Sequence, residues 1–233
     1  MGFILLEGGA EFGGRMADPD RQAMRLAGGP DVPISIIPAA AAPDNNHRRA
    51  GRKGVDWFQG LGATNVSVLP LIDRASANDP EIAVALATSK LIYLLGGFPR
   101  YLGQVLDGSR SWQAISNAYR SGVVVAGSSA GAMVLCEYYY DPVSSQAVKG
   151  LNLVERICIL PHHNTFGKDW VPQLKKQLPD IILFGIDEET GALYIASSGN
   201  WRVYGKGKIT VYYSRHVDKF EAGQEFALEI GVG

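Results

Sequence analysis

Short apolar runs alternate with more polar, helix-forming stretches along much of the chain. The apolar runs are rich in Val, Ile and Leu, as strands buried on both faces are, and they cover residues 3–6, 32–37, 66–69, 91–95, 123–126, 157–160 and 181–186. Helices are predicted between them, at about residues 18–27, 44–60, 81–88, 100–106, 111–120, 130–135 and 168–178. This alternation predicts an α/β fold, with a mostly parallel sheet and helices on both of its faces.

Two parts of the chain depart from this alternation. Residues 137–150 are aromatic and loop-like, and we expect them to form one wall of a pocket. Residues 192–196, 201–204 and 209–213 read as short strands around glycine turns, which predicts a small antiparallel extension. No repeat or linker interrupts the sequence, so residues 1–233 are predicted to form a single domain.

Composition narrows the class of protein. The formal net charge of −1 gives no global field for drawing in nucleic acid or an anionic membrane. No apolar stretch reaches the roughly 20 residues that span a bilayer, and the N-terminus lacks the basic region of a signal peptide, so we expect a cytoplasmic protein. Cys136 and Cys158 lie in apolar elements and are expected to be buried free thiols. No Cys-His cluster has zinc-site spacing, and no metal or organic cofactor is expected.

The strongest chemical signal follows the apolar run at 123–126. It is the pentapeptide GSSAG at residues 127–131, and the stretch 130–135 then reads as a helix. A strand, G-x-S-x-G and a helix together are typical of a nucleophile elbow. In this hypothesis Ser129 stands at the tip of the turn, and the Ala130 N–H is free to meet a developing oxyanion. The alternative is a glycine-rich turn that only packs, or that holds a phosphate.

Two further glycine-rich loops are expected at the same edge of the sheet. Residues 7–14 follow the first strand and invite comparison with a dinucleotide site, but they lack the G-x-G-x-x-G spacing. Gly96 and Gly97 follow the strand at 91–95 and could present a second oxyanion N–H, because glycine lets the backbone approach a substrate closely. Ligands of parallel sheets bind beyond the C-terminal strand ends, so we expect these loops and the elbow to meet at one site.

A serine nucleophile needs a base, and the chain has four histidines. His47 lies in a basic helix start, and His216 lies in the polar C-terminal region. Only His162 and His163 follow a strand on the predicted functional edge. Because a strand alternates faces, one of this pair should point towards Ser129 and the other away from it.

The base in turn needs a carboxylate that orients it and stabilises the imidazolium. Asp187, Glu188 and Glu189 end the strand at 181–186, and any of them could reach the histidine. Glu137 and Asp141, from the aromatic stretch after the elbow, are rivals. The resulting order, serine, histidine, acid, differs from that of α/β-hydrolases, in which the acid lies between the other two.

These residues resemble a family of serine peptidases that comprises aspartyl dipeptidase (dipeptidase E) and cyanophycinase. The resemblance extends from residue 4 to about residue 213, and its specific marks are Leu95-Gly96-Gly97, Gly127-Ser128-Ser129-Ala130-Gly131-Ala132, Pro161-His162 and Gly185-Ile186-Asp187-Glu188. It implies a fold like that of class I glutamine amidotransferases, which is a flavodoxin-like arrangement of three layers.

The resemblance also selects one residue from each cluster. Carried over to the matching positions, it implies that Ser129 is the nucleophile, His162 the base and Glu188 the acid, with Gly97 and Ala130 as oxyanion donors. The implied activity is serine-type hydrolysis of a peptide or other amide bond, with a small peptide as the substrate.

The chain departs from the family pattern at positions that concern the substrate. Cyanophycinases have Asn-Gln where this chain has Phe98-Pro99, and Asp-Gln where it has Leu160-Pro161. Two polar substrate-reading positions are therefore apolar, which argues against cyanophycin as the substrate. We expect Phe98, Pro99 and His163 to line the substrate site. The arginine with which the dipeptidase binds an N-terminal aspartate has no clear counterpart.

Two rival functions stay open at this stage. An amidotransferase-like enzyme normally has cysteine at the elbow, whereas here Ser129 stands there and Cys136 lies two helical turns further into the core. A binding or sensing domain could keep the fold without turnover, since fold alone does not establish activity. No nucleic-acid or membrane partner is expected, and a homodimer is compatible with the sequence.

Overall fold

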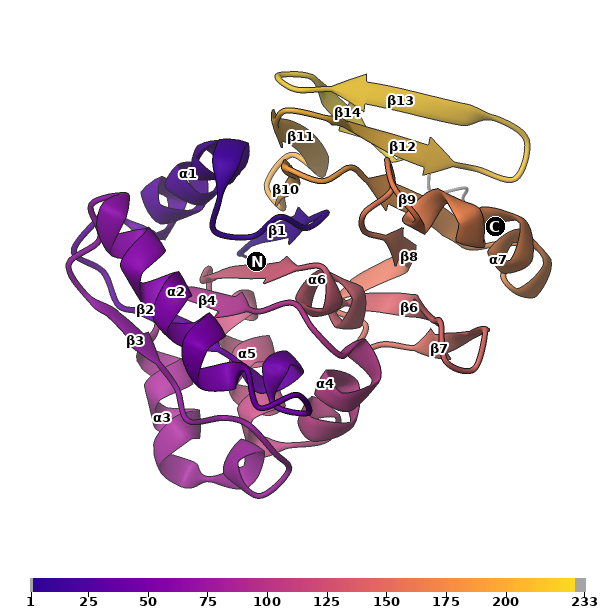
Figure 1. Cartoon of the computed structure of the whole chain (residues 1–233). Coiled ribbons are helices and arrows are strands. Elements are labelled where there is room, and N and C mark those ends of the chain that lie inside the picture. The colour runs from indigo at the N-terminus through magenta and orange to yellow at the C-terminus, as the bar shows by residue number, and fades with distance from the viewer. Residues whose placement is uncertain (1, 229–233) are drawn as a thin grey trace.

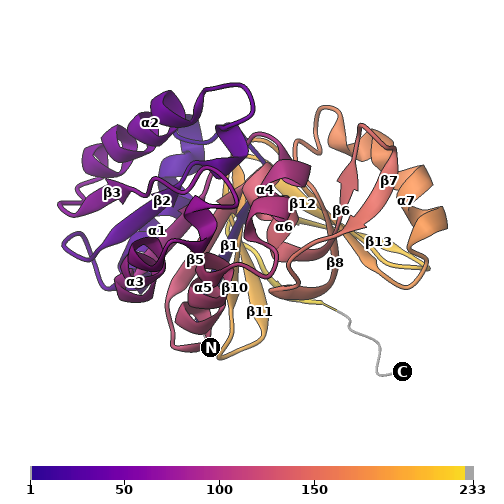
Figure 2. The same ribbon diagram turned by 90° about the horizontal axis from the view of Figure 1, so that it is seen from below.

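Two β-sheets lie side by side in the computed structural model of the chain, which describes residues 2–228 (Figure 1, Figure 2). The strands are β1 (Phe3–Glu7), β2 (Ile34–Ile37), β3 (Val66–Val68), β4 (Leu91–Leu94), β5 (Val124–Ser128), β6 (Cys136–Asp141), β7 (Gln146–Lys149), β8 (Val154–Leu160), β9 (Ile182–Ile186), β10 (Thr190–Ile195), β11 (Asn200–Gly205), β12 (Lys208–Tyr212), β13 (Val217–Glu221) and β14 (Glu225–Ala227). The α-helices are α1 (Ala17–Ala27), α2 (His47–Gly60), α3 (Pro80–Thr88), α4 (Pro99–Leu106), α5 (Arg110–Arg120), α6 (Ala130–Leu135) and α7 (Val171–Gln177).

The first sheet has eight strands in the order β14-β11-β10-β1-β5-β4-β2-β3. The five strands from β1 to β3 in this order run parallel, as the apolar runs predict. Helices α1 and α2 pack on one face of this sheet, and α3 and α5 pack on the other. Strands β10 and β11 form the predicted antiparallel extension beside β1. The predicted α/β class is therefore confirmed.

The second sheet has six strands in the order β13-β12-β9-β8-β6-β7. The last of the predicted extension strands pairs here, as β12, and not with β11. The expectation of a loop at residues 137–150 is wrong, because this stretch forms the hairpin β6–β7. Strand β6 also pairs in parallel with β8, and Tyr140 stacks on Trp170 with ring centroids 4.9 Å apart. The pairing with β8 and the contact with Trp170 involve residues outside this stretch, so the local sequence alone does not reveal the strand.

The short helix α6 lies between the two sheets. All of its residues are buried, and it contacts β5 of the first sheet and both β6 and β8 of the second. Small residues make this possible: a Cβ added to Gly131 would lie 2.2 Å from the Leu94 carbonyl oxygen. The N-terminus of α6, where Ser129 stands, is therefore held at the junction of the two sheets.

Two expectations from composition can be compared with this structure. Cys136 and Cys158 are free and buried, as predicted, and burial raises the pKa of both thiols. Among residues 2–228, no helix combines the length and the apolar character needed to cross a membrane.

Candidate active site

Ser129 occupies a strained turn between β5 and α6. Its backbone has φ 47° and ψ −110°, a conformation that non-glycine residues rarely adopt. A Cβ added to Gly127 would lie 2.5 Å from the carbonyl carbon of Gly131, so the turn is too tight for a side chain at that position. The Ser129 N–H donates to the Glu7 carbonyl oxygen, at 3.0 Å, which ties the turn to the end of β1. These are the local features of a nucleophile elbow.

The His162 ring lies against the Ser129 hydroxyl. Its Nε2 is 2.9 Å from Ser129 Oγ. The residue follows β8 with a left-handed backbone, φ 50°, and its N–H donates to the Gly8 carbonyl oxygen at 2.6 Å. The ring stacks on Phe166, with centroids 4.9 Å apart. A Cβ added to Gly9 would lie 2.3 Å from the ring, so the glycine loop after β1 makes room for the histidine.

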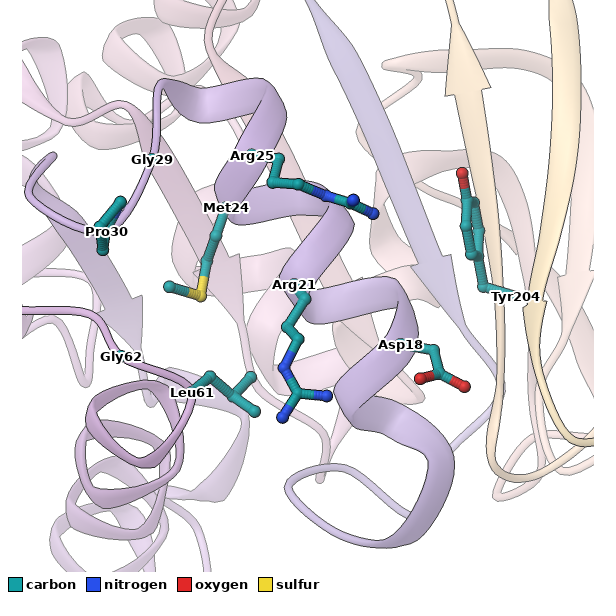
Figure 3. A pocket seen from close by; sticks show the side chains of 9 residues that line it. All are labelled: Asp18, Arg21, Met24, Arg25, Gly29, Pro30, Leu61, Gly62 and Tyr204. Atoms are coloured by element: carbon teal, nitrogen blue, oxygen red, sulfur yellow. The ribbon is translucent and has the colours of Figure 1, made fainter.

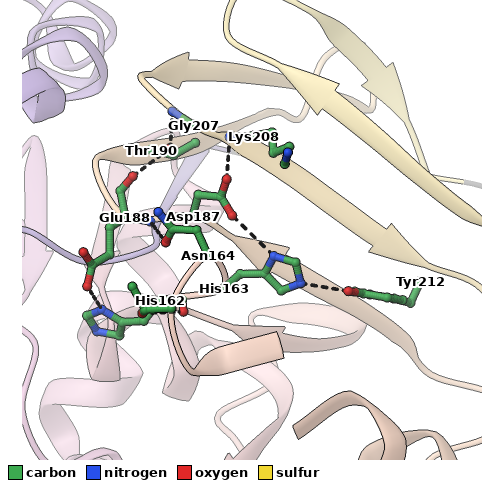
Figure 4. A network of polar contacts seen from close by, with 10 residues as sticks. His162, His163, Asn164, Asp187, Glu188, Thr190, Gly207, Lys208 and Tyr212 are labelled. Carbon is green, nitrogen blue, oxygen red and sulfur yellow. Dashed lines mark hydrogen bonds and ion pairs between the residues drawn. The ribbon is translucent and has the colours of Figure 1, made fainter. Parts of the chain in front are cut away.

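Glu188 holds the other side of the same ring. Its Oε1 lies 2.8 Å from His162 Nδ1, on the nitrogen that faces away from Ser129 (Figure 4). The Glu188 N–H donates to Asn164 Oδ1 at 2.9 Å, so the loop that carries His162 and the turn that carries Glu188 are joined directly. Serine, histidine and glutamate thus form one continuous chain of side-chain contacts.

The neighbouring His163 points elsewhere. Its ring is buried, with Nδ1 3.3 Å from Asp187 Oδ1 and Nε2 2.8 Å from the Tyr212 hydroxyl (Figure 4). Both ring nitrogens are therefore bonded inside the second sheet. The expectation that His163 lines the substrate site is not supported by this geometry, because the ring faces away from Ser129.

The rival carboxylates have other partners. Asp141 pairs with Arg100 at 3.1 Å, and Glu137 accepts the Arg156 N–H at 2.8 Å. Glu189 lies 3.5 Å from Lys206 Nζ and also accepts a backbone N–H. None of these three carboxylates contacts His162 within the described part of the chain.

The backbone after β4 approaches the elbow from the side. The Leu95 N–H donates to Ile37 O at 3.1 Å, and the Phe98 N–H donates to Ala40 O at 2.8 Å. Between them, the Gly97 N–H has no acceptor within residues 2–228. A Cβ added to Gly96 would lie 3.3 Å from Ser129 Cβ, so this segment lies beside the serine. One unbonded N–H is therefore available next to Ser129.

The remaining site residues predicted from sequence flank this segment. Ala130 is the first residue of α6, so its N–H has no acceptor within the helix. Phe98 is the N-cap of α4, and Pro99 is its first residue. The Phe98 side chain is about half exposed. Phe98 and Pro99 follow Gly97 in the chain, and so they adjoin the segment that lies beside Ser129.

Three residues at this site were not singled out from the sequence. Phe166 stacks on the His162 ring, Asn164 accepts the Glu188 N–H, and Glu11 accepts the Gly96 N–H at 2.9 Å. The only available signal for Glu11 was a carboxylate inside a glycine-rich loop. Phe166 and Asn164 lie close in sequence to the histidine pair, but this closeness alone did not indicate a role.

A second acidic cluster is buried behind the elbow. Glu7 is fully buried and accepts a hydrogen bond from the Tyr93 hydroxyl, and Asp20, which is also fully buried, lies near enough to influence it electrostatically. Asp20 also accepts the Trp57 Nε1–H at 2.8 Å. Burial raises the pKa of Glu7 well above its usual range, and burial raises the pKa of Asp20 to about 7. Because burial disfavours the charged form of both carboxyl groups, and the Asp20 charge adds to this effect on Glu7, the pair holds a proton near neutral pH.

A cavity of about 590 Å³ lies on another part of the surface, beside α1 (Figure 3). Figure 3 labels the residues that line it, which are Asp18, Arg21, Met24, Arg25, Gly29, Pro30, Leu61, Gly62 and Tyr204. None of them belongs to the group around Ser129, so this cavity is separate from the candidate active site.

Comparison with known proteins identifies the family. Residues 4–199 match the family model described as peptidase family S51. A cyanophycinase from Synechococcus elongatus is 30% identical over 228 residues, with 93% of this chain and 69% of the relative covered. A cyanophycinase from Geminocystis herdmanii is 26% identical over 219 residues, covering 89% of this chain and 79% of the relative.

Solved structures agree with this family assignment. A peptidase from an acI-B1 Actinobacterium superposes with a TM-score of 0.88 at 28% identity, and 98% of this chain and 97% of that one are covered. A putative peptidase E protein from Listeria monocytogenes EGD-e has a TM-score of 0.62 at 17% identity, covering 96% of this chain and 100% of that one, and shows the shared fold. The chain therefore belongs to peptidase family S51 and is a hydrolase of the serine-peptidase kind.

Proposed function

We propose that Ser129, His162 and Glu188 form a catalytic triad that hydrolyses an amide bond in small peptides. The observation that carries the proposal is the chain of contacts from Ser129 Oγ to His162 Nε2, at 2.9 Å, and from His162 Nδ1 to Glu188 Oε1, at 2.8 Å. Both distances lie in the range in which a nucleophile, a base and its orienting carboxylate can pass and stabilise a proton.

In the proposed reaction, Ser129 Oγ attacks the carbonyl carbon while His162 Nε2 takes the hydroxyl proton. Glu188 accepts a hydrogen bond from Nδ1 and stabilises the imidazolium. The tetrahedral intermediate collapses when His162 gives its proton to the leaving amine, which breaks the amide bond and leaves an acyl-enzyme. Water then attacks the ester carbonyl while His162 takes one of its protons. His162 returns that proton to Ser129 Oγ as the ester bond breaks, so the carboxylic acid product leaves and the serine is regenerated.

The developing oxyanion needs preorganised donors. The Gly97 N–H, which has no protein acceptor in the described chain, and the Ala130 N–H at the start of α6 are the two amides that we assign to this role. Donors fixed in this way stabilise the charge in the transition state without reorganising, and each typically contributes 10²–10³ in kcat.

The surroundings favour a short peptide with an apolar group near the scissile bond. Phe98 and Phe166 each expose about half of their side chains beside the proposed triad, and Pro99 follows Phe98. The curated relatives named above are cyanophycinases. Because the positions 98 and 99 are apolar here, we propose that this chain acts on a different, less polar peptide.

Labelling with a fluorophosphonate probe tests the proposal. The probe reacts with a serine only when a base activates it, so the wild-type protein should gain the mass of one probe and Ser129→Ala should gain none. Ser198→Ala, which removes an exposed serine from a turn, should label like the wild type. A wild-type protein that stays unlabelled would favour a binding or sensing domain and overturn the proposed function.

A further inference from the structure

Glu11 belongs to the loop that follows β1, and its carboxylate reaches the backbone beside the nucleophile. Its Oε2 accepts the Gly96 N–H at 2.9 Å. A Cβ added to Gly96 would lie 3.2 Å from this oxygen and 3.3 Å from Ser129 Cβ. The carboxylate, the Gly96 backbone and the serine are therefore packed around one point.

The hydrogen bond between Glu11 and Gly96 fixes a backbone segment that would otherwise be free to rotate. The amides on either side are fixed by backbone acceptors, Leu95 to Ile37 and Phe98 to Ala40. Gly96 and Gly97 have no side chains to limit their rotation. With the Gly96 N–H held by Glu11, the Leu95–Gly96 peptide is fixed, and the Phe98 bond to Ala40 fixes the Gly97–Phe98 peptide. The Gly96–Gly97 peptide lies between these two, and its Gly97 N–H is the amide left unbonded in this part of the described chain.

We propose that Glu11 is a positioning residue for the reaction, because its carboxylate fixes the Leu95–Gly96 peptide and thereby holds the next peptide so that the Gly97 N–H meets the oxyanion, which forms on the substrate's carbonyl oxygen when Ser129 attacks. This inference rests on the proposed function. Glu11 does not touch the reacting atoms in this role and acts through the backbone of Gly96.

The surroundings of the carboxylate fit a group that accepts a hydrogen bond. Burial raises the pKa of Glu11, whereas the Gly96 N–H and the charge of Lys53 act in the opposite direction. An alternative role would be to attract a cationic group of the substrate. The two roles differ in what they need, since positioning needs an acceptor at the right reach and attraction needs a negative charge.

Two conservative variants separate these roles. Glu11→Gln keeps the reach and an amide oxygen that can accept the Gly96 N–H, but it removes the charge. Glu11→Asp keeps the charge but is one methylene too short. Positioning predicts that kcat stays within about threefold of the wild type in Glu11→Gln and falls about 10–100-fold in Glu11→Asp, with KM changed by no more than about threefold in both.

Glu11→Ala, which removes the acceptor, should lower kcat by about 10²–10³-fold, again with little change in KM. Thermal unfolding of every variant identifies any that do not fold, and the Gln and Asp pair decides the question if Ala fails to fold. A more active Asp than Gln variant, a loss confined to KM, or wild-type kcat in all three variants would each overturn the positioning role.

The rate of fluorophosphonate labelling distinguishes failure of the Glu11 role from failure of the proposed function. If the wild type is labelled and Glu11→Asp is labelled at the same rate, only the role of Glu11 is wrong. If the wild type is not labelled at all, the proposed triad fails and the role of Glu11 fails with it. A slower reaction of Glu11→Asp than of Glu11→Gln is the expected result.

Discussion

Adjacent histidines have opposite environments in this protein. His162 contacts Ser129 and Glu188, whereas His163 is buried between Asp187 and Tyr212. His162→Ala should therefore lower kcat about as much as loss of the serine, by about 10⁴–10⁶-fold, because neither residue works without the other. Steady-state kinetics on the best peptide found provide the measurement.

His163→Ala serves as the matched control. It should leave kcat within about tenfold and instead lower the free energy of unfolding by about 1–3 kcal/mol, because it leaves buried polar partners unsatisfied. Urea unfolding measures this effect. If His163→Ala were the more damaging change for kcat in a folded protein, His163 would be the base.

Glu188 can be separated from its neighbour by the same logic. Glu188→Gln removes the charge that stabilises the imidazolium and should lower kcat by about 10²–10⁴-fold. Glu189→Gln alters a carboxylate that contacts Lys206 and should have little effect on kcat. Equal activity in the two variants would show that Glu188 is not the third member.

The sequence was a better guide to the serine than to its partners. The small residues around Ser129 are dictated by the tight turn, so the motif can be recognised locally. The choice between His162 and His163 stayed open from the residues alone, because the alternation of strand faces stops at Leu160, where β8 ends, and His162 is left-handed. Its selection depended on the resemblance to a known family.

The glycine loop after β1 supports the histidine through its lack of side chains. Gly9 has φ 124°, and a Cβ there would lie 2.3 Å from the His162 ring. Gly9→Ala should displace the ring and lower kcat by at least about 100-fold, since a misplacement of about 1 Å has effects of that size. Gly13→Ala is the control, because the nearest atom to its added Cβ is 3.8 Å away. Comparable losses in both variants would contradict this account.

Elements could be predicted where the local pattern carries the information. The parallel strands are continuous apolar runs, so the sequence alone predicts them. Strand β6 was missed because it is defined by pairing with β7 and β8 rather than by its own alternation of polar and apolar residues. Strands β13 and β14, which pair with β12 and β11 in different sheets, lie in the stretch that the sequence left without an assignment.

At the scale of the whole molecule, the acid pair behind the elbow links stability to pH. In the unfolded chain Asp20 loses its proton near pH 4, whereas in the folded protein its pKa is raised to about 7. Between these values the folded state binds more protons, so the free energy of unfolding should fall as pH rises, by up to about 1.4 kcal/mol per pH unit for each such group.

Asp20→Asn removes this titration and can still accept the Trp57 N–H. The variant should show a flatter dependence on pH and a smaller loss of stability at neutral pH than the wild type. Urea unfolding from about pH 4 to about pH 8 measures both curves. Parallel curves for the two proteins would show that Asp20 does not carry the effect.

The proposed proton path crosses from one sheet to the other. Ser129 follows β5 of the first sheet, whereas His162 and Glu188 follow β8 and β9 of the second. A small slip between the sheets would part the serine from the imidazole and leave the imidazole on its carboxylate. The rate of turnover therefore depends on how the two sheets are aligned. Mild urea should abolish activity before the far-ultraviolet circular dichroism changes, and simultaneous loss of both signals would show that the sheets do not move separately.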